Sequence, residues 1–218
     1  MELLKPDIEL KIVMLGPTGV DKTNLVLRYT ENRYVDPLLP TIGCNIFTKT
    51  LKIEGHNVKV NIWDTSGQES FQDASSKLFY CGSAGALLVY NTENRYSFDS
   101  IPKFLQRFRA KAPENAVVML VGNQLWDSPE QRVVSTDEGI EFSNSNNLLF
   151  METSARNSIN VDEAFITLIT EIIHRLQNTG NIQSNQVDEV PQQSPPIEKK
   201  KVGFFSSLFT KKKTETSQ

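Results

Sequence analysis

Apolar residues recur along this chain with two different spacings. Continuous apolar runs with the length of buried strands lie at residues 10–15, 85–90, 116–121 and, more briefly, 148–151. Apolar residues at helical spacing lie at 22–29, 97–111 and 161–176, and the capping sequence Ser135-Thr136-Asp137-Glu138 opens one further helix. Strands that alternate with helices predict an α/β fold with a largely parallel sheet.

A β-hairpin is predicted at 46–53 and 58–63, where apolar and polar residues alternate on either side of Glu54-Gly55. Towards the C-terminus the chain becomes rich in Asn, Gln, Ser and Pro and loses its periodicity, which predicts a disordered linker. We therefore expect a folded domain at 8–178, a linker at 179–198 and a basic, aromatic tail at 199–218.

The composition indicates a cytoplasmic location and gives no support for nucleic acid as a partner. A chain of 218 residues with 39% hydrophobic residues suits one domain, and a net charge of −3 gives no indication of nucleic-acid binding. No segment has the length of a membrane span, and the N-terminus lacks the apolar run of a signal peptide. Cys44 and Cys81 are then expected to be free thiols in the cytoplasm.

The first strand leads into the loop GPTGVDKT, residues 16–23, which opens a helix. A phosphate-binding loop of the pattern G-x-x-x-x-G-K-[ST] needs converging backbone N–H groups, a lysine for the terminal phosphates and a hydroxyl for Mg²⁺. Gly16, Lys22 and Thr23 fit this pattern, but Asp21 stands where the pattern has glycine. The alternative interpretation is a Gly/Pro turn that begins a helix.

Two further segments supply the rest of a phosphoryl-transfer site. The sequence WDTSGQE follows the third strand and offers Asp64 to a metal shell, the Gly67 amide to a γ-phosphate and Gln68 to an attacking water. The sequence PTIG lies in a loop, where the hydroxyl of Thr41 could reach the same Mg²⁺.

The set GxxxxxKT, PTIG, WDTSGQE, LLVYN, VGN and ETSAR, in this order, resembles the Ras superfamily of small GTPases, and residues 42–47, 61–64 and 88–90 are most similar to its Rab branch. The resemblance covers about residues 8–178. It implies the small-GTPase P-loop fold, with a six-stranded, mostly parallel sheet flanked by about five helices. It also implies a function in vesicle and membrane traffic, with protein effectors and regulators bound through residues 36–47 and 64–80.

The resemblance assigns a role to each matching residue. Lys22 would hold the β and γ phosphates, Gln68 would orient the catalytic water, Asn123 would contact guanine, and the backbone around Ser154-Ala155 would meet the guanine O6. The implied metal set is Thr23, Thr41 and Asp64. The implied nucleotide-binding set is Gly16, Gly19, Val20, Lys22, Thr23, Thr41, Gly67, Asn123, Asp127, Ser154 and Ala155.

The chain departs from the family pattern at both ends of the nucleotide. A carboxylate about 4 Å from a phosphate charge would cost about 4 kcal/mol at an effective dielectric constant of about 20, or roughly a thousandfold in affinity. In the guanine loop, Gln124 and Trp126 replace the lysine and aspartate of N-K-x-D, and the carboxylate is displaced to Asp127, which could still reach the base through a bulge. Asn91 and Arg156 are milder replacements, and Cys81-Gly82 stands where Rabs show an arginine-glycine pair.

A hypothesis for Asp21 follows from its place before a helix. As an N-cap, its carboxylate would accept hydrogen bonds from the amides of Thr23 or Asn24 and fill the anion site itself. Lys22 would then pair with Asp64, and no metal would be required. In the alternative, Asp21 turns into solvent and nucleotide still binds weakly.

The tail ends KKKTETSQ and has no cysteine for a prenyl anchor, so none is expected. Two lysine triplets, at 199–201 and 211–213, bracket Phe204, Phe205, Leu208 and Phe209, which would share one face of a helix. Residues 199–213 could therefore contact an anionic membrane surface. The alternatives are a solvated tail or a short basic motif bound by a protein partner.

Three functions follow from these features. The leading one is a Rab-like trafficking module with impaired GTP and GDP binding, located in the cytoplasm or peripherally on the cytosolic face of an endomembrane. The second is a working switch, a GTPase that binds GTP with Mg²⁺ and hydrolyses it slowly to GDP and phosphate. The third binds a non-guanine nucleotide or another anion. Mg²⁺ and GTP or GDP are the cofactors if binding survives Asp21, and otherwise none is expected.

Overall fold

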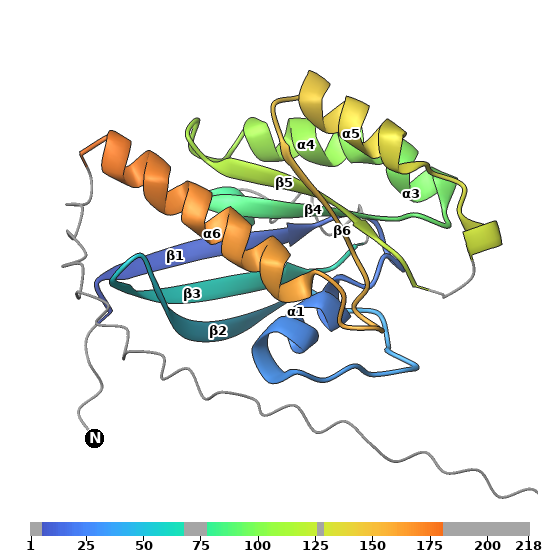
Figure 1. Cartoon of the computed structure of the whole chain (residues 1–218), viewed down its shortest axis with the longest axis horizontal. Helices are drawn as coiled ribbons and strands as arrows, with labels where there is room; N and C mark the ends of the chain where they lie inside the picture. Colours follow the sequence, from blue (N-terminus) through green and yellow to red (C-terminus); the bar gives the residue numbers. More distant parts are fainter. Residues whose placement is uncertain (1–5, 68–77, 126–128, 181–218) are drawn as a thin grey trace, which may run out of the picture. The chain divides into compact units, whose positions relative to one another are not determined.

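The computed structural model describes residues 6–67, 78–125 and 129–180, and its centre is one six-stranded sheet with the strand order β2-β3-β1-β4-β5-β6 (Figure 1). The strands are β1 (Ile8–Leu15), β2 (Cys44–Ile53), β3 (His56–Thr65), β4 (Gly85–Asn91), β5 (Val117–Asn123) and β6 (Leu149–Thr153). Neighbouring strands are parallel except β2 and β3, which form an antiparallel pair. The α/β fold with a mostly parallel sheet is thus confirmed.

Helices cover both faces of the sheet (Figure 1). The helices described are α1 (Lys22–Glu31), α3 (Arg95–Asp99), α4 (Ile101–Arg109), α5 (Thr136–Ser145) and α6 (Val161–Asn178), with a 3₁₀ turn, η1 (Pro129–Gln131). One hydrophobic cluster joins the sheet to α1 and α6, and the other joins it to α3, α4 and α5. The five described helices agree with the number that the sequence implied.

Burial on both faces explains the continuous apolar strands. In β1, Ile12 and Met14 belong to the cluster under α1 and α6, whereas Val13 and Leu15 belong to the cluster on the other face. All four side chains are fully buried. A strand with helices on both sides has no polar face, and its sequence therefore does not alternate.

The hairpin and the capping box are confirmed. Glu54 and Gly55, at φ 47° and 81°, form the two-residue turn between β2 and β3, as a turn that needs two positive φ values requires. At the start of α5, the Ser135 hydroxyl accepts from the Glu138 amide at 3.2 Å, and the Glu138 carboxylate accepts from the Ser135 amide at 2.9 Å.

The single helix predicted at 97–111 is wrong, because α3 and α4 are separate helices divided at Ser100. Pro102 lies in the first turn of α4. Proline has no N–H to donate to the carbonyl four residues earlier, here that of Phe98, so a continuous helix loses a hydrogen bond at this point. The apolar spacing continues across the break, which is why the pattern predicted one helix.

The loops that follow β1, β3, β5 and β6 carry the motifs identified in the sequence, and parallel strands bring them to one edge of the sheet. None of the helices among the described residues is long and apolar enough to cross a membrane. Cys44 and Cys81 are free thiols, as predicted. The tail, and the linker beyond Gly180, lie outside the described residues.

Candidate functional site

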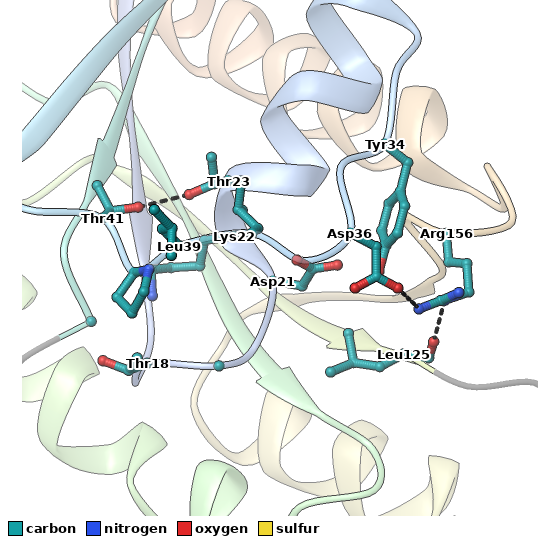
Figure 2. A pocket seen from close by; sticks show the side chains of 14 residues that line it. Thr18, Asp21, Lys22, Thr23, Tyr34, Asp36, Leu39, Thr41, Leu125 and Arg156 are labelled. Atoms are coloured by element: carbon teal, nitrogen blue, oxygen red, sulfur yellow. Dashed lines mark hydrogen bonds and ion pairs between the residues drawn. The ribbon is translucent and has the colours of Figure 1, made fainter.

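A pocket of about 240 Å³ opens at this edge of the sheet (Figure 2). Its walls come from the loop after β1, the start of α1, the connection between α1 and β2, and the loops after β3, β5 and β6. The lining residues are Thr18, Gly19, Asp21, Lys22, Thr23, Tyr34, Asp36, Leu38, Leu39, Pro40, Thr41, Gly67, Leu125 and Arg156. The sequence motifs therefore meet around one cavity.

At two glycines, Gly16 and Gly67, the backbone of the loop after β1 packs directly against neighbouring backbone. At Gly16, with φ +137°, an added Cβ would lie 2.2 Å from the carbonyl oxygen of Val89 in β4. At Gly67, an added Cβ would lie 2.3 Å from the amide nitrogen of Thr18. Contacts this short leave no room for a side chain, so the segment after β3 runs directly against the loop that would hold phosphates.

Asp21 keeps the backbone of a glycine. Its φ and ψ are 68° and 31°, in the left-handed region that glycine adopts without penalty. Other L-residues pay about 1–2 kcal/mol there, although Asp and Asn are among the most tolerant. Asp21 therefore has a backbone conformation that a glycine at this position would adopt without strain.

The carboxylate of Asp21 does not cap α1, so the self-capped hypothesis is wrong. Its Oδ1 accepts a hydrogen bond from Asn24 Nδ2 at 2.7 Å, and its Oδ2 is buried without a hydrogen-bond partner. An N-cap residue usually has extended φ and ψ, and the left-handed backbone aims this side chain elsewhere. The solvent-facing alternative is wrong as well, because Asp21 lines the pocket and burial raises the pKa of its carboxyl.

The self-capped hypothesis required an ion pair between Lys22 and Asp64, and Lys22 has other partners instead. Its buried Nζ donates to the carbonyl oxygens of Gly16 at 2.9 Å and Pro17 at 2.8 Å, which ties the start of α1 back to the loop. Burial lowers the pKa of Lys22 to about 8, and the charge of Asp64 acts in the opposite direction. These contacts use two of the three N–H donors of the ammonium group, and the third is left for a phosphate oxygen.

The predicted metal set is brought together. Thr23 Oγ1 donates to Asp64 Oδ2 at 2.6 Å and lies 2.9 Å from Thr41 Oγ1 (Figure 2 shows the two threonines). Asp64 Oδ1 is buried without a hydrogen-bond partner, and burial raises the pKa of this carboxyl. Two hydroxyls and an unsatisfied carboxylate oxygen are hard ligands of the kind that Mg²⁺ prefers, so these residues fit the ion.

Asn123 connects three loops rather than projecting freely into the pocket. Its Nδ2 donates to the Val20 carbonyl at 3.2 Å, and its Oδ1 accepts from Thr153 Oγ1 at 3.2 Å and from the Ala155 amide at 3.3 Å. The hydroxyl of Ser154 donates to the carbonyl of Gln124 at 3.0 Å. The loops after β1, β5 and β6 are therefore fixed to one another, and the implied contact of Asn123 with guanine stays a prediction.

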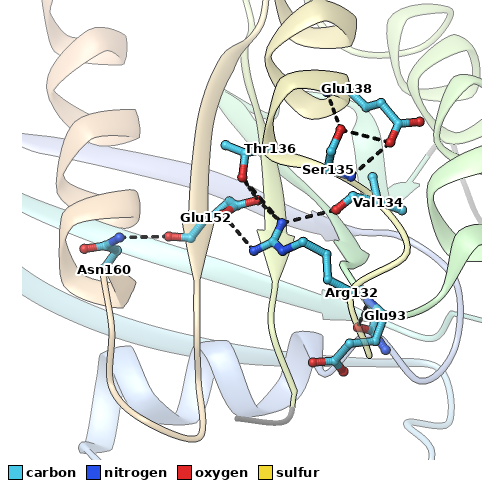
Figure 3. Close-up of polar contacts among 9 residues, drawn as sticks. Glu93, Arg132, Val134, Ser135, Thr136, Glu138, Glu152 and Asn160 are labelled. Carbon is cyan, nitrogen blue, oxygen red and sulfur yellow. Dashed lines mark hydrogen bonds and ion pairs between the residues drawn. The ribbon is translucent and has the colours of Figure 1, made fainter. Parts of the chain in front are cut away.

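An ion pair fixes the C-terminal end of the guanine loop, here called the base loop, which connects β5 to α5 (Figure 3). Two guanidinium nitrogens of Arg132 donate to the carboxylate of Glu152, at 2.7 and 3.1 Å. Thr136 Oγ1 donates to the same carboxylate at 3.1 Å. Glu152 directly precedes Thr153, the partner of Asn123. This network holds the end of the base loop against β6.

Sequence reasoning missed the residues that hold the segment between α1 and β2. The side chain of Asn24 exchanges two hydrogen bonds with the backbone of Val35, both at 2.9 Å. Arg156, read only as a mild replacement, pairs with Asp36 at 2.6 Å across 120 positions of sequence. No short motif links these residues, so only the folded chain reveals them. Gln68 and Asp127 lie outside the described residues.

The comparisons with known proteins agree with this geometry. The model of the Ras family matches residues 11–174. The chain is 41% identical to Ras-related protein RGP1 of Oryza sativa subsp. japonica, over 84% of this chain and 79% of the rice protein. It is 40% identical to Ras-related protein Rab11D of Nicotiana tabacum, over 83% and 80%, and 39% identical to Ras-related protein RABA4c of Arabidopsis thaliana, over 85% and 82%. The chain belongs to the Ras family of small GTPases, in its Rab branch.

Proposed function

We propose that this protein is a Rab-like module of vesicle and membrane traffic that binds protein partners through residues 36–47 and 64–80. We also propose that it binds guanine nucleotide more weakly than a chain with glycine at position 21 would. The observation that carries the second part is the carboxylate of Asp21, which is held in the loop where a diphosphate would lie.

A hydrogen bond from Asn24 holds the Asp21 carboxylate in this place. Its Oδ1 is bonded to Asn24, and Asn24 is itself buried and bonded to the backbone of Val35. Movement of the carboxylate therefore breaks a hydrogen bond inside a connected set. With the charge fixed, a phosphate about 4 Å away would lose roughly a thousandfold in affinity.

Exposed apolar side chains support the protein-partner part of the proposal. Leu39 and Ile42 are each 85% exposed and Ile46 is 56% exposed, all within residues 36–47. Large apolar side chains gathered on one exposed segment favour contact with another protein.

A working GTPase switch is the second candidate, because the three residues that would hold Mg²⁺ lie together. Thr23, Thr41 and Asp64 would hold Mg²⁺, which when bound would neutralise charge on the terminal phosphates. The unsatisfied Oδ1 of Asp64 favours this candidate. In that case Gln68 would orient the attacking water, and the nucleotide contacts would be those of the implied set.

The nucleotide content of freshly purified protein tests the proposal. We expect far less than one GDP or GTP per chain after denaturation and chromatography of the extract. Stoichiometric GDP would overturn the reduced affinity and support the working switch. Binding of several nucleotides without preference for guanine would instead support the altered base loop as the main change.

A further inference from the structure

Tyr34 and Asp36 line the pocket, and the segment 34–36 to which they belong is held at both of its edges. On the inner edge, the buried side chain of Asn24 accepts from the Val35 amide and donates to the Val35 carbonyl. On the outer edge, Arg156 pairs with Asp36 at 2.6 Å. The segment belongs to the connection between α1 and β2, whereas Arg156 belongs to the loop after β6.

Contacts with Leu125 and Tyr34 orient the side chain of Arg156 towards Asp36. Its Nε donates to the carbonyl of Leu125 at 3.1 Å, and its guanidinium group lies 5.1 Å from the centre of the Tyr34 ring. Figure 2 shows Arg156 between Asp36 and Leu125, at the end of the pocket opposite Thr23 and Thr41. A planar guanidinium group with three partners loses less freedom per contact than a flexible ammonium group would.

We propose that Arg156 and Asp36 form a clasp that closes residues 34–36 over the pocket, so that a ligand enters or leaves only when this pair opens. The walls that the pair joins come from different loops, and the pocket lies between them. This inference rests on the proposed function in one respect, that the pocket is where a ligand binds. It does not depend on how tightly nucleotide binds.

The exposure of the clasp sets the size of the expected effect. The side chains of Arg156 and Asp36 are 31% and 52% exposed. Half-exposed ion pairs stabilise only modestly, so loss of Asp36 alone should increase opening roughly threefold. Loss of Arg156 also removes the contacts with Leu125 and Tyr34, and should increase opening roughly tenfold.

The Val35 amide reports opening directly, because its N–H is bonded to Asn24 while the clasp is closed. The experiment is hydrogen–deuterium exchange of the full-length chain, read at Val35, for wild type, Asp36→Asn, Arg156→Gln and the double variant. We expect roughly threefold and tenfold faster exchange in the single variants. The double variant should exchange no faster than Arg156→Gln.

Two controls separate the clasp from general effects of charge and folding. Asp99 pairs with Arg95 at 3.0 Å in α3, with similar exposure but away from the pocket, so Asp99→Asn should leave Val35 unchanged. Arg156→Lys keeps the charge and should give an intermediate rate. Unchanged exchange at Val35 in both single variants, or independent and additive effects in the double variant, would overturn the clasp.

A ligand arm tests the gate in an Asp21→Asn background, with a fluorescent GDP as the probe. Opening the clasp there with Arg156→Gln should increase both the association and the dissociation rate, and affinity should change less than either rate. Unchanged rates together with faster Val35 exchange would overturn the gating. Failure of Asp21→Asn to bind GDP would count against the proposed function, while the exchange experiment still decides the clasp.

Discussion

At the scale of single residues, Asp21 determines how this site differs from a plain phosphate loop. It has the backbone of a glycine and the charge of an acid, with one oxygen bonded to Asn24 and the other buried without a hydrogen-bond partner. Burial raises the pKa of the carboxyl, which means that its charged form already costs free energy before any ligand arrives.

This raised pKa predicts how stability depends on pH. Below the ordinary value of 3.8, the Asp21 carboxyl is protonated in both the folded and the unfolded chain. As pH rises from there to the raised pKa, the unfolded chain ionises first, so the contribution of Asp21 to stability falls and then becomes constant. Urea unfolding of wild type and Asp21→Asn from about pH 3.5 to 7 should show this falling difference. A difference that grows in favour of wild type with increasing pH would contradict it.

Gly16 provides a second prediction at this scale. A Cβ at Gly16 would lie 2.2 Å from the Val89 carbonyl, whereas nothing lies within 4 Å of a Cβ at Gly19, which also has a positive φ. Gly16→Ala should therefore lower the free energy of unfolding by more than about 2 kcal/mol, and Gly19→Ala by about 1 kcal/mol. Equal losses in urea unfolding would mean that the contact with β4 does not limit the loop.

At the scale of elements, local patterns predicted most of what is observed. The hairpin follows from alternation around Glu54-Gly55, and α5 follows from its capping box. The break between α3 and α4 was not predicted, because the apolar spacing runs through Ser100 and the φ and ψ of Ser100 are helical. Hydrogen bonding at Pro102, rather than side-chain pattern, divides these helices.

The capping box supports a prediction for α5. Ser135→Ala removes the oxygen that accepts from the Glu138 amide and should lower the free energy of unfolding by about 1 kcal/mol. Ser145→Ala, at the exposed end of the same helix, should have almost no effect. Thermal unfolding of both variants distinguishes the cap from the general effect of replacing serine. A loss at Ser145 as large as that at Ser135 would count against the cap.

At the scale of the whole molecule, the site is assembled from loops that are distant in sequence. The motifs predicted that Thr23, Thr41 and Asp64 would meet, because each belongs to a recognisable spacing. The three-way bonding of Asn123 and the pair between Arg156 and Asp36 were not predicted. They depend on which loops the sheet order brings together, and no local pattern contains that information.

The tail, which lies outside the described residues, supports a prediction for the whole chain. If residues 199–213 contact anionic membrane, liposomes rich in phosphatidylserine should carry the full chain upward in a flotation gradient, with each lysine contributing about 1 kcal/mol. Deletion of 199–213 should abolish flotation. Serine at Phe204, Phe205 and Phe209 should weaken it, which separates apolar insertion from charge. Equal flotation without the segment would contradict membrane contact through the tail.

The most direct test of the central claim is the affinity for GDP, measured by titration calorimetry with Mg²⁺ present, of wild type, Asp21→Asn and Asp21→Gly. Asparagine keeps the shape and the tolerance for a left-handed backbone but removes the charge. Asp137→Asn, an exposed replacement in α5 with the same change in net charge, is the control. We predict that Asp21→Gly binds GDP at least about a hundredfold more tightly than wild type, that Asp21→Asn recovers most of this gain, and that Asp137→Asn recovers none. Tight binding by wild type, with no gain in either Asp21 variant, would contradict the account.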